Sequence, residues 1–179
     1  MTKPESGLFK GTSGIEDFYG DAERVIASRV AELDLREHPL QQSQLSSNKL
    51  KRLREKVKKR IATREDYYLL IWSKRLKRRR QDGVDSFWDA ERERIIRGEK
   101  TTREWTEEQK QAIMRGDKLR FNGKAMESHH SYSVSKFPHL ANLGNVIYPA
   151  THIEHLKGWH GGAYRNSKPG RRIRRIREF

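Results

Sequence analysis

The chain has 179 residues, 34% of them hydrophobic, and its 39 Lys and Arg against 24 Asp and Glu give a formal net charge of +15 at pH 7. It contains no cysteine, which excludes disulfide scaffolds, cysteine-ligated zinc fingers and iron–sulfur sites. No run of about 18 apolar residues occurs, as a membrane-spanning helix would need. The charge predicts a polyanionic partner, and composition leaves open whether this is nucleic acid, an anionic membrane face or an acidic protein.

The N-terminal part of the chain is predicted to be an arm followed by a helix. Residues 1–20 are rich in Gly, Ser and Thr without an apolar period, so we expect a flexible arm or linker. Apolar residues from Ala22 to Leu33 recur at helical spacing, and this helix should end before Pro39, because a residue that precedes proline avoids the α region.

Capping motifs predict the next helices. Ser46 or Ser47 is the expected N-cap of a helix with one apolar stripe, made of Leu50, Leu53, Val57 and Ile61. Thr63 with Asp66 forms a capping box that starts a helix running into residues 77–80. A separate helix is expected from about Val84 to Arg97, with Gly98 as its stop.

A further capping box and a β-hairpin follow. Thr106 with Gln109 starts a short helix that Gly116 ends. Residues 118–121 and 124–127 are predicted strands, joined by Asn122 and Gly123, the dipeptide typical of a type I′ turn.

The last predicted elements are a strand and a short helix. The strand covers residues 145–148, and Pro149 is expected to break it. Thr151 with Glu154 forms a capping box that places His152 and His155 in the first turns of the helix.

Histidine is concentrated in the C-terminal half. Six of the seven histidines lie between His129 and His160. A neutral imidazole can bind a divalent metal ion, and a free imidazole can accept a proton at neutral pH. Because neighbouring residues of a strand point to opposite faces, His129 and His130 could serve an ion and a water molecule respectively.

These residues resemble a known family. Ser128-His129-His130, Asn145, the segment 151–155 and His160-Gly161-Gly162 are similar to the HNH, or ββα-metal, endonucleases, and most of all to the GHH- or WHH-like nuclease domains of bacterial polymorphic toxins. The resemblance covers roughly residues 105–170, with weaker similarity from Phe87 onward. It implies a metal-dependent DNase with little sequence preference, delivered into rival bacteria and neutralised in the producer by an immunity protein.

The resemblance also implies roles for single residues. His129, His155 and His160 would bind the metal ion, His130 would be the general base, and Asn145 would brace the loop that carries the base. The ion would be Mg²⁺, Mn²⁺, Ni²⁺ or Zn²⁺, and no small-molecule cofactor is expected.

One ligand stays open between two residues. His155 and His160 are five residues apart, which is about 140° around an ideal α-helix, whereas bacteriocin-type HNH enzymes place their last two ligands four residues apart. His152 and His155 are three apart and share a helical face, so His152 is the rival of His160. Asn142 is likewise an alternative to Asn145 as the residue that braces the loop carrying the base.

Two basic segments flank the histidines. Fifteen Lys and Arg against three acids lie between Lys49 and Arg80, and seven Lys and Arg against Glu178 lie in the last fifteen residues. An unbalanced face of this kind is suited to a phosphate backbone. The residues expected to contact nucleic acid are Lys51, Arg52, Lys58, Lys59, Arg78, Arg79, Arg165, Lys168, Arg171 and Arg172.

The sequence therefore predicts an α+β protein: an arm (1–20), a helical basic region (21–100) and a ββα-metal nuclease core with a basic tail (101–179). The leading hypothesis is an endonuclease secreted as part of a larger bacterial effector and active in the target-cell cytoplasm, without membrane insertion by this chain. DNA is the expected substrate, with RNA as the alternative, and an acidic immunity protein is the expected partner. The competing hypotheses are a non-catalytic nucleic-acid-binding module with a structural zinc, and an intracellular phage or mobile-element nuclease.

Overall fold

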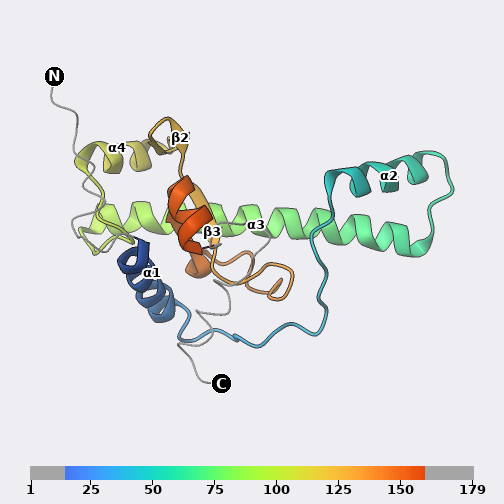
Figure 1. The fold of residues 1–179 in the computed structure, drawn as a ribbon, viewed down its shortest axis with the longest axis horizontal. Helices are drawn as coiled ribbons and strands as arrows, with labels where there is room; N and C mark the ends of the chain where they lie inside the picture. Colours follow the sequence, from blue (N-terminus) through green and yellow to red (C-terminus); the bar gives the residue numbers. More distant parts are fainter. Residues whose placement is uncertain (1–14, 160–179) are drawn as a thin grey trace.

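The computed structural model describes residues 15–159 of the chain (Figure 1). Four α-helices come first: α1 (Ile15–Arg29), α2 (Ser47–Lys58), α3 (Arg64–Arg97) and α4 (Glu107–Arg115). Four short strands and two short helices follow: β1 (Arg120–Phe121), β2 (Lys124–Ala125), β3 (Glu127–His130), η1 (Gly144–Val146), β4 (Ile147–Ala150) and η2 (Glu154–Trp159). None of the described helices is long and apolar enough to cross a membrane.

Helix α3 runs through the whole structure and divides it into two parts. Helix α2 lies beside the N-terminal part of α3, and we call residues 47–80 the basic hairpin. Leu53 of α2 and Leu76 of α3 are buried, and Lys56 Nζ lies 3.1 Å from Asp66 Oδ1. The other helices and the strands gather around the C-terminal part of α3 (Figure 1), so the basic hairpin projects from the core.

The hydrophobic core joins segments that are far apart in sequence. Ile26 of α1, Phe87 of α3, Tyr132 and Ile147 are at most 1% exposed and belong to one cluster. Helix α1 begins at Ile15, so the expected arm is wrong for residues 15–20, which are helical. The boundary expected between residues 100 and 101 stays a prediction, but this cluster includes residues from both sides of it.

Local capping chemistry determines most helix ends as predicted. Ser46 accepts a hydrogen bond from the Lys49 amide, and both predicted capping boxes form at Thr63 and Thr106. Gly98 and Gly116 end their helices in the left-handed conformation, with φ of 63° and 79°. These ends follow from contacts within a few residues, which is why the sequence predicts them.

The prediction of two helices between Thr63 and Arg97 is wrong, because α3 is continuous over 34 residues. Gly83 lies in its middle and is buried. Glycine weakens a helix by about 1 kcal/mol relative to alanine, but it also lets another backbone approach closely. Here the Ala141 carbonyl approaches so closely that a Cβ on Gly83 would lie 2.3 Å from its oxygen. Packing of the Ala141 backbone against α3 compensates for the low helix propensity of Gly83.

The strands form two small antiparallel pairs. β1 and β2 form the predicted hairpin, and Asn122 and Gly123 have φ of 50° and 76°, as a type I′ turn requires. β3 pairs with β4, which places His129 opposite Tyr148.

Pro149 does not break β4 as expected, but lies within it opposite Ser128. Its carbonyl accepts a hydrogen bond from Arg103 at 3.0 Å, so this residue's backbone polar groups face away from β3. Proline has no N–H, and at this position the ladder with β3 needs none.

A buried carboxylate joins α3 to the segment that follows it. Glu91 is fully buried and accepts hydrogen bonds from the Thr102 amide at 2.8 Å, the Thr102 hydroxyl at 2.7 Å and the Trp105 indole at 2.6 Å. Arg94 is its ion-pair partner at 2.8 Å. Residues 102–105 are thereby held against α3, which positions Arg103 for the contacts described below.

Gly144 gives a test of the packing between α3 and the segment before β4. A Cβ at Gly144 would lie 2.7 Å from the Phe87 amide nitrogen, in the backbone of α3. We expect Gly144→Ala to lower the free energy of unfolding by about 1–3 kcal/mol, because neither backbone can move without disturbing the core. Gly20→Ala is the control, since no atom of the described residues lies within 4 Å of its Cβ position. It should be neutral or stabilising in thermal and urea unfolding; equal losses in both variants would contradict the close approach.

Candidate active site

Strand β3 presents the two adjacent histidines to different surroundings. His129 is buried, with 6% of its surface exposed, and His130 is partly buried. Pairing with β4 brings β3 next to the turn at Thr151, where His152 and His155 follow. Histidines that are more than twenty residues apart in sequence therefore meet at one end of this strand pair.

The imidazole of His130 is oriented by a backbone carbonyl. Its Nε2 lies 3.0 Å from the Ala141 oxygen. A carbonyl only accepts, so Nε2 donates its proton and the neutral ring carries its lone pair on Nδ1. Burial lowers the pKa of His130 to about 4; the hydrogen bond to Ala141 acts in the opposite direction, and the charge of Arg80 lowers the pKa further. His130 is therefore neutral at pH 7.

His129 and His155 are in direct contact. His129 Nδ1 lies 2.9 Å from His155 Nε2, and the ring centroids are 4.8 Å apart. Two nitrogens that bind one ion at about 2.1 Å are about 3.0 Å apart at the right angle of an octahedral ion, and about 3.4 Å apart at a tetrahedral ion. The distance is thus suited to two ligands of a shared ion.

Glu127, two residues before His129 on β3, orients both histidines of the following turn. Its carboxylate accepts from His152 Nδ1 at 2.8 Å and from His155 Nδ1. Burial alone would raise the pKa of Glu127, but the hydrogen bonds from His155 and His152 outweigh it and lower the pKa. With Nδ1 of His155 bound to Glu127, Nε2 of His155 is the nitrogen directed toward His129.

A buried ion pair holds the turn that carries His155. Arg103 contacts both carboxylate oxygens of Glu154, at 2.7 and 2.9 Å, and both side chains are buried. Glu154 also accepts from the Thr151 amide at 2.7 Å and completes the predicted capping box. Arg103 thus connects the segment after α3 to the first turn after β4.

The donor set agrees with a divalent ion only in part. His129 and His155 offer two nitrogens at a suitable distance. Within the part of the chain that the structure describes, no group of three or more His, Asp or Glu side chains is arranged to hold a metal ion. Glu127 is directed at the Nδ1 atoms of His152 and His155, so it supports a ligand instead of serving as a third one. His160, the third ligand expected from the sequence, lies outside the described residues.

Asn145 and its alternative Asn142 make separate contacts. Asn145 Nδ2 donates to the Arg29 carbonyl at 2.9 Å, so Asn145 joins η1 to the end of α1. The loop beside His130 is instead bound through Asn142, whose side-chain oxygen accepts from Arg79.

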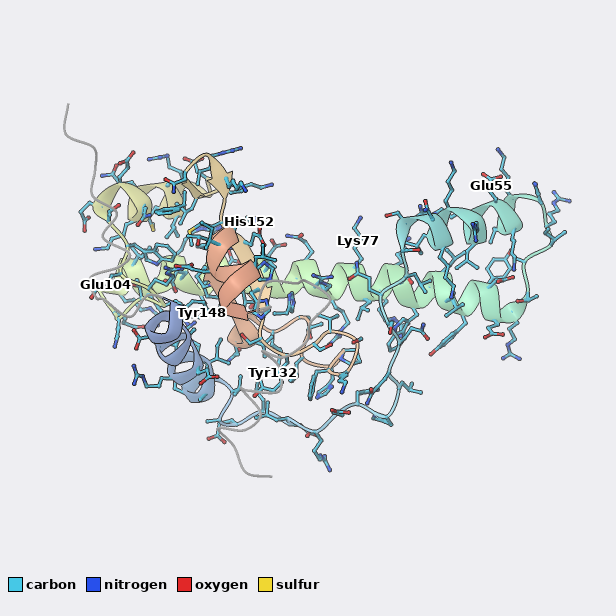
Figure 2. The ribbon with its side chains drawn as sticks, in the orientation of Figure 1. Glu55, Lys77, Glu104, Tyr132, Tyr148 and His152 are labelled. Atoms are coloured by element: carbon cyan, nitrogen blue, oxygen red, sulfur yellow. The ribbon has the colours of Figure 1, made fainter. Side chains whose placement is uncertain are left out.

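Most of the described cations expected to contact nucleic acid lie exposed on the basic hairpin. They are Lys51, Arg52, Lys58, Lys59 and Arg78. Figure 2 shows Glu55 on this hairpin and His152 in the core, well separated along α3. Arg79 differs, because its guanidinium is partly buried against the loop 138–142. Arg165, Lys168, Arg171 and Arg172 lie outside the described residues.

Arg80 and Arg103 contribute to the site although the sequence predicts no role for them there. Arg80 belongs to a run of basic residues whose members look alike in sequence, yet its charge acts on His130. Arg103 forms an ion pair with Glu154, which lies 51 residues later in the sequence. No local signal distinguishes either of them.

One comparison with known proteins gives a match. Residues 72–151, a little under half of the chain, match the family model described as "GHH signature containing HNH/Endo VII superfamily nuclease toxin". The match begins further upstream than the expected resemblance at residues 105–170, and it includes His129 and His130 but ends before His152. No curated protein and no solved structure gives a match. Residues 72–151 are therefore similar to the GHH-signature nuclease toxins of the HNH/Endo VII superfamily.

Proposed function

We propose that this chain is a metal-dependent endonuclease that hydrolyses DNA with little sequence preference and uses His130 as its general base. The observation that carries the proposal is the contact of His130 Nε2 with the Ala141 carbonyl, one residue after His129 on β3, whose ring contacts that of His155. This contact leaves Nδ1 of a neutral imidazole as the atom that accepts a proton from water.

His129 and His155 would hold the divalent ion, together with His160. Mg²⁺, Mn²⁺, Ni²⁺ or Zn²⁺ at this position would act as a Lewis acid that neutralises charge on the scissile phosphate. One fact favours His160 over His152 as the third ligand. Residues 154–159 are π-helical, and five residues is the hydrogen-bond spacing of a π-helix.

The basic hairpin would bind the phosphate backbone of the substrate. Its exposed Lys and Arg lie on one projecting unit and form few ion pairs with acids. Contacts to phosphates give affinity that falls with salt, and they carry no base information. This supports cleavage with little sequence preference. The basic residues at 165–172 would add to this surface.

The family assignment supports a role as the toxin part of a larger secreted effector that acts in the cytoplasm of target bacteria. The producer would then need an immunity protein. A strongly acidic inhibitor is suited to this chain, because a net charge of +15 steers acidic partners toward it.

His130→Ala should lower the rate of supercoiled plasmid nicking by about 100-fold or more, because a positioned general base contributes about 10²–10⁴. Metal affinity and DNA binding should stay close to wild type. Arg115→Ala, an exposed residue at the end of α4, is the control. Nicking by His130→Ala at the wild-type rate would refute the assignment of the base. A parallel assay with RNA decides the substrate class.

His129→Ala and His155→Ala should each weaken Mn²⁺ or Zn²⁺ binding in calorimetry. Glu127→Gln should weaken it by about 10- to 100-fold, because the amide has no charge and offers one acceptor oxygen to the N–H groups of both His152 and His155. His130→Ala should bind the ion normally. Chelation should abolish cleavage with little loss of helical circular dichroism, whereas a structural zinc predicts unfolding. Unchanged metal affinity in both His129→Ala and His155→Ala would contradict the shared site.

Replacing Lys51, Arg52, Lys58 and Lys59 together by Ala should reduce DNA affinity and lower the slope of log K against log salt by about 0.9 for each phosphate that the variant no longer neutralises. Cleavage at saturating DNA should be retained, since these residues lie away from the histidines. The control is the double variant Arg97→Ala/Arg115→Ala, which removes two exposed charges outside the basic hairpin. An unchanged slope in the fourfold variant would show that the hairpin does not contact DNA.

A further inference from the structure

We propose that Arg79 is a positioning residue that acts on His130 through the loop 138–142. Its Nε donates to the Pro138 carbonyl at 3.0 Å, and its terminal nitrogen donates to the His139 carbonyl at 2.9 Å and to the Asn142 side chain. All three acceptors lie within five residues of one loop. The guanidinium therefore determines where this loop lies against α3.

Gly83, one helical turn after Arg79, allows the same loop to come close. The two residues are four apart, so they lie on the same face of α3. A Cβ at Gly83 would lie 2.3 Å from the Ala141 oxygen and 3.3 Å from the Asn142 carbonyl carbon. Arg79 holds the loop from one side, and Gly83 provides the space into which the Ala141 carbonyl fits.

Arg79 and Gly83 together determine how the Ala141 carbonyl lies against His130. The Ala141 oxygen lies 3.0 Å from His130 Nε2, which keeps the proton on Nε2 and the lone pair on Nδ1. If the loop shifts, the ring loses the acceptor that fixes its orientation and its tautomer. The inference rests on the proposed function, because it gives Arg79 a part in preparing the general base.

Arg79 was expected from the sequence to contact nucleic acid, and that role makes a different prediction. A phosphate contact contributes to DNA affinity and to its salt dependence. A positioning residue contributes to the rate at saturating DNA, because a small misplacement of the base lowers the rate with the substrate already bound. Three N–H groups of Arg79 are already donated to the loop.

The test compares three arginines of α3 by steady-state cleavage of a fluorescent DNA duplex with Mn²⁺ and by DNA affinity. Arg79→Ala should lower kcat by about 10- to 100-fold, with KM and affinity changed less than about threefold. Arg78→Ala, on the exposed side, should raise KM and leave kcat unchanged. Arg97→Ala, which removes an ion pair with Glu93 at the far end of the helix, should change neither. Loss of affinity with kcat retained in Arg79→Ala would overturn the proposal.

A spectroscopic measurement keeps the test independent of activity. In ¹H–¹⁵N spectra of the wild-type imidazoles at neutral pH, His130 should be protonated on Nε2 alone, and Arg79→Ala should show a mixture of tautomers. Asn142→Ala, which removes one acceptor of Arg79, should show a smaller change of the same kind and replaces Arg79→Ala if that variant does not fold. An unchanged tautomer in these variants overturns the proposal. A wild-type chain that cleaves neither DNA nor RNA refutes the proposed function alone.

Discussion

The close approach of the segment 138–144 to helix α3 is the constraint on which both the core and the candidate active site depend. It is possible because glycine lies at Gly83 and Gly144, where any side chain would collide with backbone atoms. At Gly144 the approach lets η1 and β4 pack on Phe87, and at Gly83 it places the Ala141 carbonyl against His130. The same backbone contact thus supports the hydrophobic core and the orientation of the proposed base.

Features determined by neighbouring residues were predictable from the sequence. The N-caps at Ser46, Thr63 and Thr106, and the hairpin turn at Asn122, each depend on contacts that span three or four residues. Their chemistry is the same in any fold. For the site, the position of His129 and His130 on the strand after this hairpin was predictable because it too depends on neighbouring residues.

Features determined by contacts between distant segments were not predictable. The continuity of α3 through Gly83 depends on a loop almost sixty residues later, and Pro149 fits in β4 because Arg103 donates a hydrogen bond to its carbonyl. The difference between Arg78 and Arg79 is of the same kind. The two are neighbours in a basic run, and only the folded chain turns one toward solvent and the other onto the loop.

The continuity of α3 also has a geometric consequence for the substrate. From Arg64 to Gly83 the helix spans about 30 Å, which corresponds to about nine base pairs of duplex. Since one continuous helix carries both the basic hairpin and the loop beside His130, the proposed sites of phosphate binding and of cleavage would stay at a fixed spacing along the duplex. Under the proposed function, the shortest oligonucleotide that the protein binds and cuts in one encounter would then depend on helix length and not on base sequence.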